Sequence, residues 1–241
     1  MTALIELKDL AIRTEERMLV EGVNMTVQPG RVTALIGPSG SGKSLTARCS
    51  MGVIDVLPGL VRGELRYPAI DPERDWFEGL HGGGSEAQSK LLEDTREFRG
   101  SYFTYSPQAA SSALNPGRTV GRQLELAIAR RDVAPEDLHD EICTILKDVG
   151  LSPEVSSSLP GALSGGMAQR AALAIAIAPK PRLVIADEPE TGLDPVLRRT
   201  VVELLVEVCK VHGAGLLLIS HHEDTVERMA DDVVRLTVGG T

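Results

Sequence analysis

Residues 37 to 44 read GPSGSGKS, a spacing of glycine, lysine and serine that can bind phosphate. Glycines let backbone N–H groups turn toward phosphate oxygens without a Cβ clash. An apolar run precedes the segment and a helix is expected from about Ser44, where the helix dipole favours an anion. Lysine suits the β- and γ-phosphates, and the serine hydroxyl can ligate Mg²⁺. We therefore expect a nucleotide phosphate loop made of Gly37, Pro38, Ser39, Gly40, Ser41, Gly42, Lys43 and Ser44.

A second group of chemically active residues lies in LVIADEP, residues 183 to 189. An apolar strand there ends in two carboxylates, which would be costly to bury without a function. Asp187 is placed to hold the shell of Mg²⁺, and Glu188 is placed to orient or deprotonate an attacking water. The two motifs together predict a P-loop NTPase, and a kinase, a GTPase or a repair ATPase remains possible at this point.

Residues 163 to 170 read LSGGMAQR, which resembles the signature motif of the ABC ATPases. Ser164, Gly165 and Gly166 stand at the start of a predicted helix and offer a hydroxyl, open backbone N–H groups and a helix dipole to a γ-phosphate. The chain already has one phosphate loop, so a second phosphate-binding segment is explained if it binds the nucleotide of another subunit. The resemblance implies two subunits packed head to tail around two ATP molecules.

Other motifs of that family follow in the same order. Gln108, in YSPQ, resembles the Q-loop glutamine, which by resemblance reaches Mg²⁺ and the water. Residues 192 to 194 resemble the D-loop, whose Asp194 is implied to serve the nucleotide site. His221 follows the apolar run LLLIS and resembles the switch histidine near the γ-phosphate. The implied catalytic residues are Glu188, His221 and Gln108, and the implied metal site uses Ser44, Gln108 and Asp187.

Two details resemble the ATPases of peptide and nickel importers: SALNP at residues 112 to 116 and the methionine of LSGGM. This resemblance implies import of short peptides or nickel, with transmembrane permease subunits, a second ABC ATPase subunit, identical or different, and indirectly a substrate-binding protein as partners. Residues near 108 to 116 are implied to form part of a groove for a permease helix.

The sequence departs from the family pattern at the adenine position. No aromatic residue precedes Tyr67, so the usual aromatic platform near Arg13 or Thr14 is missing. Arg13 or Arg17 can replace it through a cation–π contact with the base. Glu190 stands where the family usually carries threonine or serine. His222 stands where the family usually carries aspartate.

The elements expected to position these motifs define the fold class. Strands are expected at 4–12, 23–27, 32–36, 183–186, 215–219 and 233–238, and helices at 44–53, 167–178, 195–211 and 224–230. Residues 68–98 read as an irregular surface insertion with one short helix near 86–98, and residues 120–149 as amphipathic helices. Short apolar strands alternating with helices predict an α/β P-loop NTPase core with a mostly parallel sheet, an N-terminal antiparallel β region and an inserted α-helical subdomain.

We expect a single ABC nucleotide-binding domain over 1–241, with a catalytic core at 1–107 and 167–241 and a helical subdomain at 108–166 that includes the signature motif. The net charge of −9 disfavours nucleic acid as the primary partner. The sequence has no apolar run long enough for a bilayer and no secretory leader, which predicts a cytosolic protein. The resemblance to importer ATPases implies a peripheral protein on the cytoplasmic face of the cell inner membrane. The alternative is a soluble ABC ATPase in DNA repair or translation.

Overall fold

The computed structural model describes residues 2–108, 113–191, 195–221, 226 and 228–237. The chain divides into two compact units, the first made of Met1–Arg99 and Gly215–Thr241 and the second of Gly100–Ala214. Parallel strands and an antiparallel sheet both occur, as the sequence predicts.

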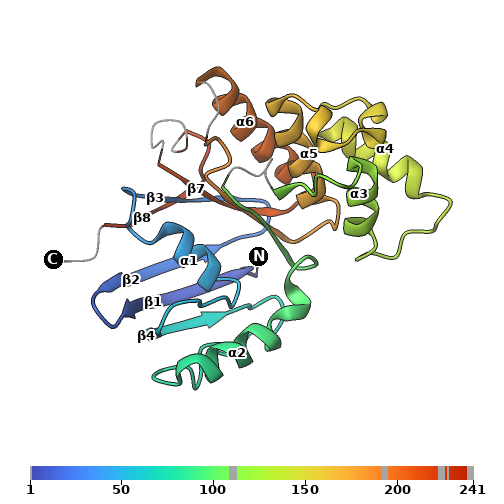
Figure 1. Ribbon diagram of the computed structural model, residues 1–241. Coiled ribbons are helices and arrows are strands. Elements are labelled where there is room, and N and C mark those ends of the chain that lie inside the picture. The colour runs from blue at the N-terminus through green and yellow to red at the C-terminus, as the bar shows by residue number, and fades with distance from the viewer. Residues whose placement is uncertain (1, 109–112, 192–194, 222–225, 227, 238–241) are drawn as a thin grey trace. The chain divides into compact units, whose positions relative to one another are not determined.

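The first unit contains an antiparallel sheet with strand order β2-β1-β4, formed by Ile5–Thr14 (β1), Met18–Val27 (β2) and Pro58–Arg66 (β4). These strands lie side by side in Figure 1. Ile5 of β1 pairs with Val27 of β2, and Glu6 pairs with Arg66 of β4. The sequence did not predict β4, since Pro58 and two glycines interrupt its pattern, and pairing with β1 outweighs that weak local preference.

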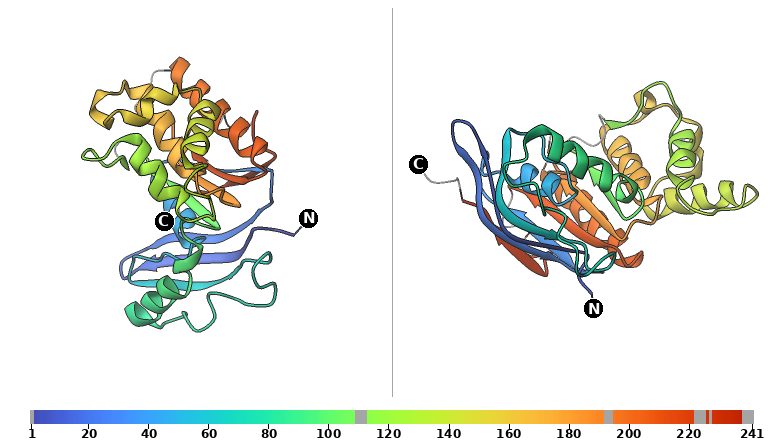
Figure 2. Two further views of the ribbon diagram at one scale, coloured as in Figure 1. Left: turned by 90° about the vertical axis from the view of Figure 1, so that its right-hand side faces the viewer. Right: turned by 90° about the horizontal axis from the view of Figure 1, so that it is seen from below.

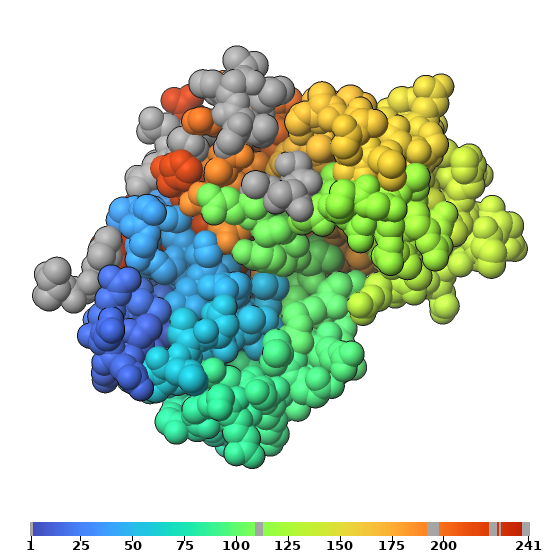
Figure 3. Space-filling model, viewed as in Figure 1, coloured from blue at the N-terminus to red at the C-terminus, as the bar shows by residue number. Residues whose placement is uncertain are grey.

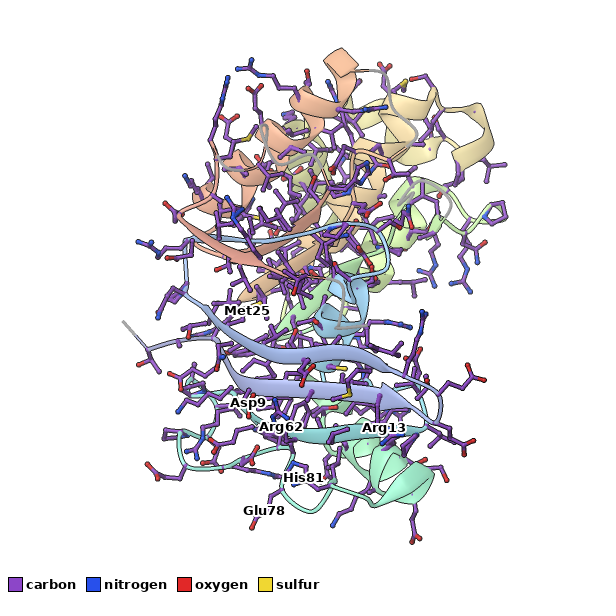
Figure 4. All side chains as sticks on the ribbon, turned by 90° about the vertical axis from the view of Figure 1, so that its left-hand side faces the viewer. Asp9, Arg13, Met25, Arg62, Glu78 and His81 are labelled. Carbon is purple, nitrogen blue, oxygen red and sulfur yellow. The ribbon has the colours of Figure 1, made fainter. Side chains whose placement is uncertain are left out.

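A bulge in β1 is held by charged side chains. Asp9 has a positive φ of 45° and lies where the register with both neighbouring strands shifts. Arg62 of β4 donates to its carboxylate at 2.7 Å, and Figure 4 labels the two residues on their neighbouring strands. An extra residue in one strand increases local twist, so the bulge bends the sheet at this point.

The first unit also contains three parallel strands. Val32–Ile36 (β3) pairs with Gly215–Ser220 (β7) on one side and with Asp232–Arg235 (β8) on the other. Every residue of β3 and β7 is buried, which explains their nearly continuous apolar sequence. The short helix α1, Lys43–Cys49, follows β3 and contacts β7.

The insertion after β4 is more ordered than the sequence suggests. Helix α2 spans Gly84–Asp94 and a 3₁₀ turn spans Arg96–Phe98. Trp76 packs between Tyr67 and Phe98, with ring centroids 5.4 and 5.3 Å apart, and Trp76 and Phe77 are buried. The prediction of an irregular surface insertion therefore misses this aromatic packing, although most of α2 lies at the surface (Figure 3).

The second unit joins two parallel strands to a helical region. Phe103–Ser106 (β5) pairs with Leu183–Asp187 (β6). The helices span Val120–Ile128 (α3), Leu138–Asp148 (α4), Gly165–Ile177 (α5) and Pro195–Val211 (α6). Figure 2 shows α3, α4 and α5 gathered together, and the three helices contact one another.

The amphipathic pattern of 120–149 is confirmed by burial. Val120, Leu124, Ile142 and Leu146 are buried in the second unit. The described part of the chain contains no helix that is both long and apolar enough to cross a bilayer. The predicted helix at 224–230 lies mostly outside the described residues, and the predicted last strand is observed as β8, shorter than expected.

Candidate functional site

The phosphate loop occupies the turn between β3 and α1 in the first unit. Gly37 is buried at its start, while Pro38, Ser39 and Gly40 are exposed. Gly42 has a φ of 87°, and a side chain there would meet Val20 of β2 and the carbonyl of Leu19. Only glycine combines this backbone conformation with such close packing.

Lys43 is held inside this loop. Its side chain is buried, and Nζ donates to the carbonyl oxygens of Gly37 at 2.8 Å and Pro38 at 3.0 Å. An ammonium has three donors, of which these two carbonyls take two. A buried cation among neutral carbonyls is desolvated, and an anion beside it would gain correspondingly. The loop therefore offers a preorganised cation to a phosphate group.

The two predicted carboxylates lie at the end of β6 in the second unit, and we call Asp187 and Glu188 the acidic end of β6. Asp187 is the last residue of the strand and is 4% exposed. Tyr105 Oη lies 2.7 Å from its Oδ2. Gln108 Nε2 lies 3.1 Å from Glu188 Oε2, so the structure brings together two residues that the sequence implicated separately.

The backbone at Glu188 is strained. Its φ of 47° lies in the left-handed region, where a non-glycine residue costs about 1–3 kcal/mol. Two residues hold the turn: Thr191 donates its N–H to the Glu188 carbonyl at 3.0 Å and its hydroxyl to Oε2 at 3.2 Å. Gln169, buried on α5, donates to the carbonyl of Pro189 at 2.7 Å. The Glu188 carboxylate is therefore held by Thr191 of the same turn and by the distant Gln108, and the turn itself is supported by Gln169 on α5.

The residues at the acidic end of β6 fit a magnesium site. Carboxylate and hydroxyl oxygens are the protein ligands that Mg²⁺ prefers, and Asp187 supplies such an oxygen at a strand end. In the other unit, Ser44 stands at the second residue of α1. The donor types expected from the sequence are therefore present.

The signature segment begins helix α5. Ser164 caps this helix, and its hydroxyl accepts a hydrogen bond from the Met167 N–H at 3.3 Å. Among the described residues, a Cβ added to Gly165 or Gly166 would meet no atom within 4 Å apart from its chain neighbours and the adjacent helix backbone. Packing within this chain therefore does not require glycine at either position, which leaves room for close approach by an outside group.

Of the remaining predicted residues, some lie within the described part of the chain and others lie outside it. His221 directly follows β7 in the first unit and is exposed. Asp194 lies outside the described residues, as does Ser112 of the SALNP segment. Asn115 of that segment is held by Gln123, whose side chain accepts from the Asn115 N–H at 2.8 Å and donates to its carbonyl at 3.2 Å.

Arg13, one of the two residues expected to contact adenine, is instead bonded to the backbone of the β1–β2 turn. Arg13 donates from Nε to the Thr14 carbonyl at 3.0 Å and from Nη2 to the Glu15 carbonyl at 3.1 Å. Figure 4 labels Arg13 on β1, close to that turn. Its guanidinium therefore stabilises the turn, and stacking on a base would compete with these bonds.

Three residues that shape the acidic end of β6 were not among the predicted site residues: Tyr105, Gln169 and Thr191. Gln169 belongs to the signature segment and Tyr105 to YSPQ, so both lay within motifs already recognised. Their targets could not be identified, because a hydrogen bond between strands or across a turn leaves no periodic signal in the sequence.

Comparison with known proteins gives this arrangement a family context. The profile of the ABC transporter family matches residues 20–191. The chain is 34% identical over 220 residues to the oligopeptide transport ATP-binding protein OppD of Lactococcus lactis subsp. cremoris, covering 90% of this chain and 61% of that protein. It is 36% identical over 227 residues to the nickel import ATP-binding protein NikD of Rhodospirillum rubrum, covering 92% and 78%.

A solved structure agrees on the fold. The cbiO1 protein of Clostridium perfringens, part of the ABC transporter complex cbiONQ, matches with a TM-score of 0.76 at 22% identity and covers 99% of this chain and 86% of that one. At that identity the likeness supports the fold alone.

Proposed function

Since the chain belongs to the ABC transporter family, we propose that it binds and hydrolyses ATP as the motor subunit of a membrane transporter. The observation that carries the proposal is the geometry of Glu188. Glu188 directly follows a buried strand, and its carboxylate accepts hydrogen bonds from Gln108 and Thr191, which hold it in one orientation. A fixed carboxylate of this kind suits the positioning or deprotonation of a water molecule.

The other residues take roles that follow from their chemistry and family position. The loop Gly37–Ser44 binds the phosphates, with Lys43 facing the β- and γ-phosphates. Ser44, Gln108 and Asp187 hold Mg²⁺, which neutralises charge on the phosphates when bound. His221 assists at the γ-phosphate. Ser164, Gly165, Gly166 and Asp194 serve the nucleotide of a second ATPase subunit, and the open space at both glycines supports this role.

The partners follow from the same proposal. We infer permease subunits in the membrane, a second ATPase subunit, identical or different, and a substrate-binding protein that acts through the permease. The chain works as one domain over 1–241, with the helical subdomain at 108–166, and is attached to the cytoplasmic face of the inner membrane. The chain spans 61% of the length of the OppD relative, so activity and cargo are inferred here from family and chemistry together.

Hydrolysis is tested with Glu188→Gln, which removes the charge of the base and keeps its shape. ATP turnover should fall at least about a hundredfold, the scale of a general base, while ATP still binds. Glu203→Gln is the matched control, because Glu203 pairs with Arg199 on the exposed face of α6. Near-normal turnover in Glu188→Gln would remove this residue from the proposed role.

Assembly is tested in the same variant, because ATP that is not hydrolysed should accumulate in a dimer. Light scattering with saturating ATP should report a dimer of Glu188→Gln, and adding Ser164→Arg should abolish it without preventing ATP binding. If the chain pairs with a different ATPase subunit, that subunit must be present in the assay. A dimer that tolerates Ser164→Arg contradicts the role assigned to the signature segment.

The cargo is inferred from the relatives, whose names specify oligopeptide transport and nickel import. Deletion of the gene should lower uptake of radiolabelled short peptides or of nickel, and sugar and phosphate uptake should persist. The intact gene should restore uptake and a Lys43→Ala gene should not. Specific loss of sugar uptake would overturn the cargo assignment and leave the ATPase proposal standing.

A further inference from the structure

Tyr105 stands one strand away from the acidic end of β6. In the parallel register of β5 and β6, Tyr105 is the partner of Ile185, and Asp187 is two residues further along β6. Side chains two residues apart on a strand point to the same face. A diagonal neighbour at that offset is within reach of an aromatic side chain. The register therefore brings the phenol to the Asp187 carboxylate.

The contact has the geometry of a charge-assisted hydrogen bond. Tyr105 Oη and Asp187 Oδ2 are 2.7 Å apart, within the range for a hydroxyl donating to a carboxylate. Asp187 is 4% exposed, so water contributes little to its solvation. An ionised carboxylate in such a place needs donors, and the phenol supplies one.

We propose that Tyr105 is a positioning residue for the metal site. Its hydroxyl fixes one oxygen of Asp187 and thereby orients the other oxygen toward Mg²⁺ or a water bound to it. This inference rests on the proposed function, in which Asp187 serves the metal. Partners that orient a metal ligand in this way typically contribute about 10–100-fold to metal affinity.

Only the hydroxyl is needed for this role. A phenylalanine ring would pack in β5 as the tyrosine ring does, but it cannot donate to Asp187. The sequence contains a matched residue in Tyr102, three positions earlier, whose ring packs edge-on against Phe103. Burial raises the pKa of Tyr102 to about 12, so its hydroxyl is protonated at neutral pH, as a control requires.

The test compares the full chain with Tyr105→Phe and Tyr102→Phe by titration with Mn²⁺ in the presence of the non-hydrolysable analogue AMP-PNP. Free Mn²⁺ is measured by electron paramagnetic resonance. Tyr105→Phe should weaken Mn²⁺ binding about tenfold, whereas Tyr102→Phe should leave it unchanged. Binding of AMP-PNP in EDTA should be equal in all three proteins, because the phosphate loop is untouched.

A second comparison separates orientation of Asp187 from general packing. In an Asp187→Asn background, Tyr105→Phe should have no further effect on Mn²⁺ affinity, because the charged acceptor is gone. Tyr105→Met serves as an additional variant without a hydroxyl, since the flexible methionine fills the space of the ring. It should match Tyr105→Phe in Mn²⁺ affinity.

The outcomes distinguish the two proposals. The role of Tyr105 would be overturned if Tyr105→Phe bound Mn²⁺ with wild-type affinity, or if a full tenfold loss persisted in the Asp187→Asn background. Either result would leave the proposed function standing. A wild-type protein that binds neither AMP-PNP nor Mn²⁺ would overturn the proposed function, and the inference on Tyr105 with it.

Discussion

The phosphate loop and the acidic end of β6 are built in opposite ways. The loop uses eight consecutive residues, and its lysine is held by carbonyls of the same loop, at Gly37 and Pro38. The acidic end of β6 depends on three side chains that are distant in the sequence, Tyr105, Gln108 and Gln169, together with Thr191 of the same turn. One region is specified locally, and the other exists only after distant segments have folded together.

This difference separates two kinds of failure. A change in the loop removes the group that binds phosphate and should act directly on nucleotide affinity. A change around the acidic end of β6 leaves the phosphate ligands in place and alters how a carboxylate is held. Nucleotide binding should then persist while turnover or metal affinity falls.

The largest effect on nucleotide affinity is expected for Lys43→Ala. Removal of a buried charged partner costs about 2–5 kcal/mol, so ATP affinity should fall at least about thirtyfold. Isothermal titration with ATP and Mg²⁺ measures the change, and Lys43→Met controls for lost packing, with the same expected loss. ATP affinity within threefold of wild type in both variants would contradict the role of the loop as the principal phosphate site.

A smaller effect, on turnover and stability but not on ATP affinity, is expected for Gln169→Leu. The substitution leaves the buried carbonyl of Pro189 without its donor, which costs about 1–3 kcal/mol of stability and loosens the strained turn at Glu188. ATP turnover should fall about tenfold, which corresponds to a rise of about 1.4 kcal/mol in the activation barrier, with ATP affinity unchanged. Steady-state turnover and isothermal titration separate the two quantities.

Gln88→Leu is the matched control for this change. Gln88 on α2 also donates from its amide to backbone carbonyls, those of Val56 at 2.9 Å and Pro58 at 3.3 Å. Its loss should lower the melting temperature and leave turnover intact. If Gln88→Leu reduced turnover as much as Gln169→Leu, the effect would belong to general stability rather than to the acidic end of β6.

The smallest effect is expected far from both regions, at Glu141 on α4. Arg131 lies 2.7 Å and Lys180 3.1 Å from Glu141 Oε1. Burial alone would raise the pKa of this carboxyl, but hydrogen bonds and charge from Arg131 and Lys180 outweigh it, and the pKa lies below its ordinary value. Its charged form therefore stabilises the fold above the unfolded pKa, near 4.3, and this contribution disappears as pH falls through the lower folded pKa.

Glu141→Gln should accordingly cost about 1 kcal/mol at pH 7, or about 2–4 °C in melting temperature. The difference from wild type should shrink below about pH 4, and ATP binding and turnover should not change. Glu125→Gln is the control, because Glu125 forms an ion pair with the exposed Arg122 on one turn of α3 and should shift the melting temperature less. A pH-independent difference for Glu141→Gln would show that packing, not charge, is responsible.

The same contrast explains which elements were predictable. Helix α6 was predicted with its observed bounds, Pro195–Val211, and β3 with Val32–Ile36, because a long amphipathic pattern and a continuous apolar run are strong local signals. Strand β5 was not predicted, since FTYS is four residues long and half polar. Its stability comes from pairing with β6, a contact that a single segment does not reveal.

The aromatic residues of the insertion show most clearly what local sequence composition cannot predict. The charged, glycine-rich stretch around Gly82–Gly84 predicted an irregular surface insertion, and α2 is indeed mostly exposed. Yet Tyr67, Trp76 and Phe98 converge from separate positions, and the rings of Tyr67 and Trp76 are buried in this contact. Mutual burial of scattered residues depends on the path of the chain in space, which local composition does not encode.

The amino-acid sequence alone was sufficient for the phosphate loop, the signature segment and the carboxylates at a strand end, because each is a contiguous motif whose chemistry follows from residue type and spacing. The folded structure was needed to find that Tyr105 meets Asp187, that Gln108 and Thr191 meet Glu188, and that Gln169 supports the strained turn. The physical reason is range: backbone conformation and periodicity are local properties, whereas the orientation of a carboxylate depends on donors that only strand register and helix packing bring within 3 Å or so.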